Sequence, residues 1–386
     1  MTFTRTELEA RAREDLRRLR TPEGWLMAGL PRFARLFGRD SAIVALQLLP
    51  EDPSVAAATI RALAARQGRV DDRRREEQPG KLPHEAPVRL ADLLRLELRK
   101  HLRWGFPYYG SIDSTSWWVR LVDRYAAATG DVALVEEVRP QLVEAARWMA
   151  GDARIGVDDL VAYVRRNPAG LLHQGWRDSD LGAVPIAAPV ALVEVQGYHA
   201  EAAAALARLG VRAPAAVAPD RAAFERRFWR PELGTYALAV GGDGVVAAIA
   251  TSNAGHLLGT PIIDADRAGA VADRLFAEDL WTPAGIRTHS SHDPHFDGHS
   301  YHRGSIWPHD NWVIHEGLRA VGRHDDARRV RRAVLDALCD LEHLPELYAY
   351  DDAPGGGRVV ALGVAQPVQA WASGAALAFL AAEAAD

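Results

Sequence analysis

Apolar residues recur with helical periodicity along almost the whole chain, and no other feature constrains its fold so strongly. Strand-like alternation is confined to the segments 158–166 and 234–250, and the second contains the turn sequence GGDG. We therefore expect an all-α fold with short β-hairpins in the connecting loops. The segments predicted to be helical are 4–20, 40–49, 53–67, 86–103, 114–129, 131–151, 190–209, 218–228, 251–258, 263–275, 304–321, 323–342 and 366–384.

The predicted helices follow one another in a helix–loop–helix rhythm, and no Gly/Ser-rich or Pro-rich linker interrupts it. Helix pairs of this kind can close into a double ring, with inner helices facing the axis and outer helices covering them. The connecting loops at one end of such a ring form a pocket. We therefore expect residues 1–386 to form a single domain of this type.

Charge and composition exclude several classes of protein. The net charge is −5 and no block of basic residues is present, so a nucleic-acid partner is not expected. The first twenty residues resemble a charged helix rather than a signal peptide, and no apolar run is long enough for a membrane span. A soluble cytoplasmic protein is expected. Cys339 is the single cysteine, so a disulfide framework and a thiolate zinc cluster are both excluded.

The segments between the helices are unusually rich in aromatic and ionisable residues, which points to function rather than to solubility alone. Tryptophan and tyrosine offer a flat apolar face and a polar edge, a combination that suits a sugar ring. The alternative is that each ring fills the rim of the helix bundle. The loop tryptophans are Trp104, Trp117, Trp118, Trp176, Trp307 and Trp312.

Two loop carboxyls have neighbours that suit acid–base chemistry. Glycoside hydrolysis needs two such groups, and apolar surroundings keep the acid protonated near neutrality. Asp178 follows Trp176 in the sequence GWRDSD, and Glu346 lies between apolar residues in LPELY. Composition alone does not single out this pair. Other loop carboxyls are Asp40, Glu85, Asp113, Asp180, Asp297 and Asp310.

Taken together, the loop motifs resemble the catalytic domain of glycogen-debranching amylo-α-1,6-glucosidases and their relatives. These relatives include processing α-glucosidases of the family 63 type and the bacterial mannosylglycerate and glucosylglycerate hydrolases. The motifs occur in order and cover most of the chain, and the last but one is the most specific. They are PRFARLFGRDS, GKLPHE, YYGSIDSTSWW, GWRDSD, EVQGY, SNAGHLL, GIRTHSS, SYHRGSIWPHDN and LPELY.

The resemblance implies an (α/α)6 barrel and an inverting glycoside hydrolase. It assigns Asp178 as the general acid and Glu346 as the general base, roughly 6.5–9.5 Å apart with a water between them. Asp180 is the alternative acid. The Phe-Gly-Arg-Asp motif implies that Arg39 and Asp40 hold sugar hydroxyls. Residues expected to line the same pocket are Tyr109, Asp113, Trp117, Trp176, Gln196, Trp307 and His309.

Debranching enzymes use additional domains to handle a polymer, and we expect this chain to form at most the barrel. A terminal α-linked glucose or mannose in a small glycoside is therefore the expected substrate, such as glucosylglycerate or an α-gluco-oligosaccharide. Arg303 in the Tyr-His-Arg-Gly sequence resembles the mannosylglycerate-type pattern and could bind an anionic aglycone. Arg32, Arg35 and Arg287 are the alternatives for that role. No cofactor is implied, and the oligomeric state is left open.

Three other interpretations compete with a hydrolase. The histidines between residues 289 and 309 could bind a metal, but no helical His-Glu-x-x-His motif or cysteine accompanies them, so no metal site is predicted. A structural calcium stays possible. N-acylglucosamine-type 2-epimerases share the barrel and use paired histidines, although they would not need Asp178 and Glu346. A non-catalytic sugar-binding barrel would keep the tryptophans and need neither carboxyl.

Overall fold

The computed structural model describes residues 2–87, 104–154, 156, 158–179, 183–214, 217–352 and 356–386. Apart from its first two residues, the helix predicted over 86–103 falls outside these ranges, and so does Asp180. All statements about structure below concern the described residues.

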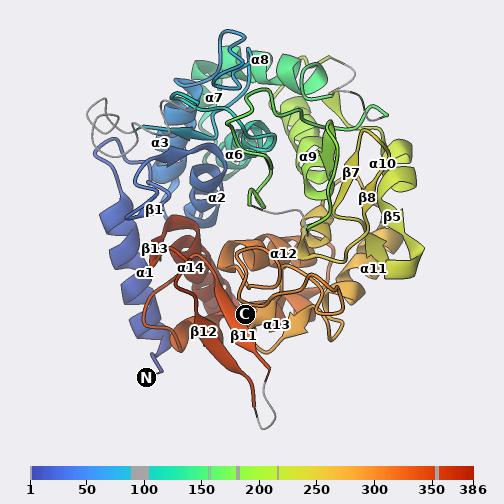
Figure 1. The fold of residues 1–386 in the computed structure, drawn as a ribbon. Coiled ribbons are helices and arrows are strands. Elements are labelled where there is room, and N and C mark those ends of the chain that lie inside the picture. Colours follow the sequence, from blue (N-terminus) through green and yellow to red (C-terminus); the bar gives the residue numbers. More distant parts are fainter. Residues whose placement is uncertain are drawn as a thin grey trace.

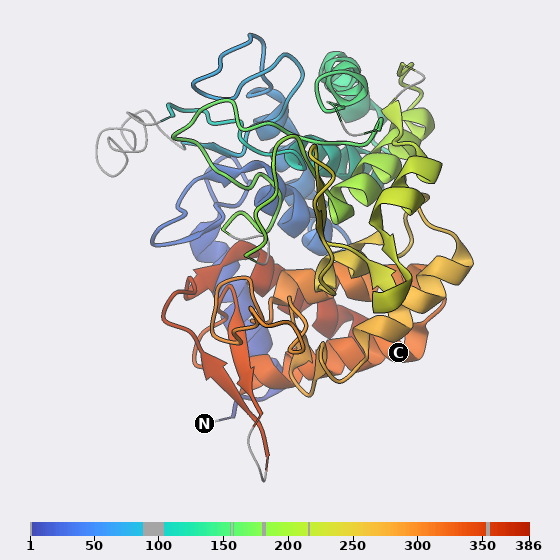
Figure 2. The same ribbon diagram turned by 45° about the vertical axis from the view of Figure 1, so that its right-hand side comes forward.

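Two concentric layers of helices surround a central axis (Figures 1 and 2). Each inner element packs against the next along the chain, and α14 returns to pack against α2, which closes the ring. The expected all-α (α/α)6 barrel is confirmed. The inner ring consists of α2 (Gly38–Leu48), α6 (Ser114–Thr129), α9 (Val193–Arg208), the 3-10 helix η3 (Ser252–Leu257), α12 (Pro308–Ala320) and α14 (Ala370–Ala385).

The outer layer covers the apolar faces of the ring. Helix α3 packs on α2 and α6, α8 on α6 and α9, and α13 on α12 and α14. Several outer helices begin at an N-cap residue whose side chain accepts a hydrogen bond from a backbone N–H. Examples are Asp52, Asp220 and Asp264. The outer helices are α1 (Arg5–Leu19), α3 (Pro53–Ala64), α7 (Val132–Glu137), α8 (Arg139–Ala150), α10 (Arg221–Phe228), α11 (Ala265–Leu275) and α13 (His324–Cys339).

Short antiparallel pairs connect the helices. GGDG joins β7 to β8, as its sequence predicted, but 158–166 forms only an isolated bridge between Tyr163 and Val190. The backbone of Val161 is instead hydrogen-bonded to the side chain of Gln196. The pairs are β1 (Gly29–Leu30) with β13 (Val368–Gln369), β2 (Leu36–Phe37) with β3 (Glu85–Ala86), β4 (Val190–Leu192) with β7 (Ala239–Gly241), β7 with β8 (Val246–Ala247), β5 (Trp229–Arg230) with β6 (Thr235–Tyr236), β9 (Trp281–Thr282) with β10 (Gly285–Ile286) and β11 (Tyr348–Asp351) with β12 (Arg358–Ala361).

The inner elements share a direction, and this places the motifs. Helices α2, α12 and α14 all begin near the same end of the axis, so Arg39, Trp307 and Trp371 come together there. Cys339 is buried at the end of α13, as expected of a small apolar residue. Among the described residues, no helix has the length and apolar character that a bilayer span requires.

Candidate active site

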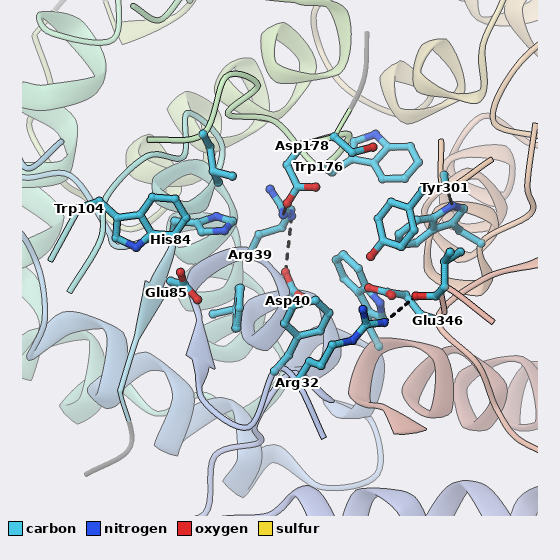
Figure 3. Close-up of a pocket in the computed structure, with 17 residues that line it drawn as sticks. Arg32, Arg39, Asp40, His84, Glu85, Trp104, Trp176, Asp178, Tyr301 and Glu346 are labelled. Atoms are coloured by element: carbon cyan, nitrogen blue, oxygen red, sulfur yellow. Dashed lines mark hydrogen bonds and ion pairs between the residues drawn. The ribbon is translucent and has the colours of Figure 1, made fainter. Parts of the chain in front are cut away.

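A cavity of about 490 Å³ lies at the end of the axis where α2, α12 and α14 begin. Its size is within the range of small-molecule sites. Figure 3 shows Asp178 and Glu346 projecting into it from different walls, with Asp40 lower in the pocket. The walls combine carboxyls, two arginines and many rings: Arg32, Arg39, Asp40, His84, Glu85, Trp104, Trp176, Asp178, Tyr301, Trp307, Glu346 and Trp371.

The loop that carries Asp178 is fixed by the residues on either side of it. The Arg177 guanidinium is buried and donates to the carbonyl oxygens of Thr288, at 3.1 Å, and of His302, at 2.6 Å. The Ser179 hydroxyl lies 2.7 Å from Nδ1 of His302. These contacts anchor the loop to the segment before α12, so the Asp178 carboxyl is held over the cavity rather than left in solvent.

Glu346 is held in a hydrogen-bonding environment that suits a carboxylate. Its Oε1 accepts from Nε2 of Gln369 at 3.1 Å, and its Oε2 lies 3.5 Å from the backbone nitrogen of Gln366. The Tyr301 hydroxyl also hydrogen-bonds to it, which lowers its pKa. An ionised carboxylate only accepts hydrogen bonds, so these donors favour the charged form, but burial outweighs them and leaves the pKa of Glu346 raised.

Arg39 connects the carboxyls at the bottom of the cavity. Its Nη1 donates to both oxygens of Asp113, at 3.3 and 3.2 Å. It also lies 3.6 Å from Asp40 and 3.8 Å from Asp178, both longer than a hydrogen bond. Asp113 is fully buried behind the arginine and accepts from Ser111 at 2.6 Å. The guanidinium is therefore positioned by Asp113, and its remaining charge is directed toward the cavity.

Three cavity carboxyls have strongly raised pKa values. Burial raises the pKa of Asp178 to about 6, of Asp40 to about 7 and of Glu346 to about 8. Like charges add to each shift, whereas Arg39 opposes the shifts of Asp40 and Asp178. Carboxyls that exchange protons near neutrality are typical of catalytic sites, where they serve as general acids and bases.

Stacked rings form the rest of the cavity wall. The Trp371 ring lies parallel to His309 with the ring centres 3.7 Å apart, and Trp176 meets Trp307 edge-on at 5.6 Å. Buried polar atoms usually have partners, yet several here have none among the described residues. They are Nε of Arg39, Oδ1 of Asp40 and Nε1 of Trp176 and Trp371.

The structure brings together Arg39, Asp40, Trp176, Asp178, Trp307 and Glu346 in one cavity, as the sequence predicted. The lining residues that were not singled out from the sequence include Tyr301 and Trp371. Tyr301 lies inside the recognised SYHRGSIWPHDN segment, which could have identified it. Trp371 lies in the Ala-rich start of α14, where composition resembles an ordinary helix and gives no signal.

Other residues predicted for the pocket are found elsewhere. The Tyr109 hydroxyl donates to the carbonyl of Arg66, and the Gln196 amide is hydrogen-bonded to the backbone of Val161. Trp117 packs against Arg120 and Tyr198, one turn into α6. None of the three lines the cavity.

Asp113, His309 and Arg303 lie beside the cavity rather than on its surface. Asp113 acts through Arg39, and His309 is buried behind the Trp371 ring. Arg303 is partly buried in the loop before α12, with its Nε 3.5 Å from the Ser300 hydroxyl. Direct contact of these side chains with a ligand in the cavity is therefore not expected from the observed geometry.

The loop histidines are dispersed instead of converging on one point. His289 is buried 3.1 Å from Asp293, whereas His299 lies 2.6 Å from Asp351 near the surface. Within the described ranges, no group of three or more His, Cys, Asp or Glu side chains has the arrangement of a metal site.

Residues 36–350 match the model of the mannosylglycerate hydrolase MGH1-like glycoside hydrolase domain. No curated protein sequence matches the chain significantly. A solved structure of the GH63 mannosylglycerate hydrolase from Thermus thermophilus in complex with glucose superposes with a TM-score of 0.70 at 18% identity, over 97% of this chain and 100% of the other.

The same enzyme in complex with Tris and D-glycerate gives a TM-score of 0.69 at 17% identity, over 97% of this chain and 100% of that one. A structure described as a wild-type glycosidase gives 0.60 at 16% identity, over 98% and 97% of the two chains. At these identities the superpositions establish the shared helical-barrel fold. The family model spans most of the chain and includes both candidate carboxyls. The chain therefore belongs to the MGH1-like glycoside hydrolases.

Proposed function

We propose that this glycoside hydrolase removes a terminal α-linked glucose or mannose from a small glycoside with inversion of configuration. Asp178 is the general acid that protonates the leaving oxygen. Glu346 is the general base that activates a water on the opposite face of the ring. The catalytic unit is the whole barrel, residues 1–386, and no cofactor takes part.

One observation carries the proposal: the buried Glu346 and the partly buried Asp178 reach a single cavity from different walls, and both carboxyls have raised pKa values. Arg39 and Asp40 line the cavity and supply a donor and an acceptor for sugar hydroxyls. The rings of Trp176 and Trp371 supply apolar surface for the sugar faces.

The assignment is tested by Asp178→Asn and Glu346→Gln, assayed on glucosylglycerate, mannosylglycerate and α-gluco-disaccharides. Each variant should lose about 10²–10⁴-fold in kcat, because this is the usual contribution of one general acid or base. Glu278→Gln is the matched control, since its side chain is 90% exposed and outside the cavity. Near-normal turnover in either cavity variant would contradict the roles.

The stereochemical course of the reaction can be measured separately. With an α-linked substrate, early proton NMR spectra should show the β-anomer of the released sugar before mutarotation. An initial α-anomer would mean retention and would exclude the proposed role of Glu346 as a base acting on water.

Whether the substrate carries an acidic group depends on which arginine in the cavity is free to bind it. Arg35 pairs with Glu85 at 2.7 Å, and Arg287 pairs with Asp352 outside the cavity. Arg32 lines the cavity, donates to the carbonyl of Val364 at 2.7 Å and has no carboxylate partner among the described residues. We therefore assign recognition of an acidic aglycone, such as glycerate, to Arg32 in place of Arg303.

A pair of variants separates the two arginines. Arg32→Gln should raise KM for an acidic glycoside about tenfold or more and leave a neutral disaccharide little affected, because only the acidic substrate loses a charge-assisted hydrogen bond. Arg303→Gln should leave the ratio of the two unchanged. The opposite pattern would return the role to Arg303.

A further inference from the structure

A second cavity, of about 480 Å³, lies toward the other end of the barrel axis; we call it the far cavity. It is formed by later turns of the inner helices whose first turns form the catalytic cavity. Leu46 and Leu49 come from the end of α2, and Trp312 comes from the middle of α12. Neither the catalytic proposal nor the family assignment uses it.

The far cavity contains an arginine that makes no direct ion pair, although the nearby charge of Glu201 stabilises its cation. The Arg120 guanidinium lies over the Trp117 ring, 4.0 Å from its centre, and 5.4 Å from the centre of the Tyr198 ring. Its Nη1 is buried without a hydrogen-bond partner, and Arg120 makes no hydrogen bond or ion pair with any described residue. Burial lowers the pKa of Arg120 to about 10, so the group is still cationic at neutral pH.

The nearby carboxylates are already engaged with other cations. Glu201 pairs with Arg208 at 2.8 Å and lies 3.5 Å from Arg124. Glu316 hydrogen-bonds to His315 at 3.0 Å and pairs with Arg319 at 3.5 Å. A cavity-facing guanidinium with unused donors is costly to keep desolvated, and the cost is removed when an anion binds.

We propose that the far cavity is a binding site for a small organic monocarboxylate, which forms a forked ion pair with Arg120. The guanidinium fork matches the two oxygens of a carboxylate. Leu46, Leu49 and Trp312 give the body of the ligand an apolar surface. The charges of Glu201 and Glu316 on the same walls disfavour a dianion such as a phosphate monoester.

The far cavity is connected to the catalytic cavity through one histidine. His256 lines the far cavity, and its ring stacks on Trp176 of the catalytic wall at 5.8 Å. Its Nε2 donates to Asp310 at 2.7 Å, which leaves Nδ1 to accept from the Tyr198 hydroxyl. Because Arg120 rests on Tyr198, a carboxylate that moves the guanidinium also shifts the contact that supports Trp176.

The site is tested by isothermal titration calorimetry of the full chain with benzoate as the probe and benzamide as its neutral analogue. Benzoate should bind once per chain, and Arg120→Gln should weaken it about tenfold or more, the usual effect of losing a charge-assisted hydrogen bond. Arg32→Gln removes the unpaired cation of the catalytic cavity and should leave benzoate binding intact. Loss of binding in Arg32→Gln and not in Arg120→Gln would overturn the proposal, and so would equal binding of benzamide.

Three further measurements test the remaining alternatives. Arg120→Met keeps the aliphatic stem on Trp117, so it should fold with a Tm near that of the parent; failure to fold would mean that Arg120 is structural. Inorganic phosphate should bind more weakly than benzoate, and tighter Arg120-dependent binding of phosphate would refute the carboxylate preference. Saturating benzoate should change KM in the parent and not in Arg120→Gln, and an unchanged KM would refute the connection through His256.

Discussion

The ion pair between Asp113 and Arg39 offers the sharpest test of how the cavity is built. Both side chains are buried, at 0% and 3% exposure, and Asp113 is the carboxylate that hydrogen-bonds to the guanidinium. Asp113→Asn keeps the size of the side chain and removes its charge. Arg39 then lacks a hydrogen-bonded anion in a place that water reaches poorly, and breaking a buried pair in this way costs about 3–5 kcal/mol.

This cost translates into a measurable shift in thermal stability. A chain of 386 residues has an unfolding entropy of about 0.8 kcal/mol/K. The expected fall in Tm is therefore about 4–6 °C by differential scanning calorimetry. Asp123→Asn is the matched control: Asp123 is also buried, but its partner Arg208 is half exposed and can be hydrated. That variant should lose no more than about 1 °C.

The same substitution has a catalytic signature that a purely structural role would not produce. The charge of Asp113 raises the pKa of Asp178, and Arg39 lowers it. Without Asp113 the positive charge acts more strongly on Asp178, so the pKa of the general acid falls. The acidic limb of kcat/KM should move to lower pH. Equal losses of Tm in the two variants, together with an unchanged pH profile, would refute this account of the cavity.

The remaining predictions concern the catalytic pair. The pH profile of kcat/KM should be bell-shaped: kcat/KM increases with pH up to a bend near pH 6 and decreases with pH beyond a bend near pH 8. If the bend near pH 6 belongs to Asp178 and that near pH 8 to Glu346, roughly 1% of the enzyme at a pH between the two bends has Asp178 protonated and Glu346 ionised, which is the active form. A single bend below pH 5 would contradict the assignment. Tyr301→Phe removes a hydrogen bond that lowers the pKa of Glu346, so the alkaline bend should move to higher pH; movement of the acidic bend instead would reverse the assignment. Trp371→Ala should raise KM for every substrate by about tenfold, because it removes a ring from the wall, and an unchanged KM would place the sugar elsewhere.

The helical layout was predictable because nearly every inner and outer helix has its own apolar face and stop signals. Its departures have local causes. The helix predicted at 251–258 is a short 3-10 turn, where Gly255 packs so closely on Ile314 and Leu275 that an added Cβ would lie within 3 Å of both. The helix predicted at 131–151 divides at Val138, two residues before Pro140.

The residues of the catalytic cavity were predictable from the sequence where a motif lies at the start of an inner helix. Motif residues one turn further along the helix were predicted less well. Arg39 and Asp40 occupy the first turn of α2 and reach the cavity. Trp117 belongs to an equally specific motif, yet it lies far enough into α6 to face the far cavity. A sequence motif fixes which residues are neighbours along the chain, whereas the face of the helix decides which cavity each side chain enters.

The arrangement of polar and apolar residues separates stability from function in this barrel. Apolar side chains fill the space between the inner and outer layers, where α3 packs on α2 and α13 packs on α14. The axis instead holds buried polar groups such as Asp113, Glu194 and Asp310. Burial raises the pKa of Glu194 to about 7, a cost that an ordinary core would avoid with an apolar residue. The layer between the rings is therefore the core, whereas the two proposed binding sites lie toward the ends of the axis.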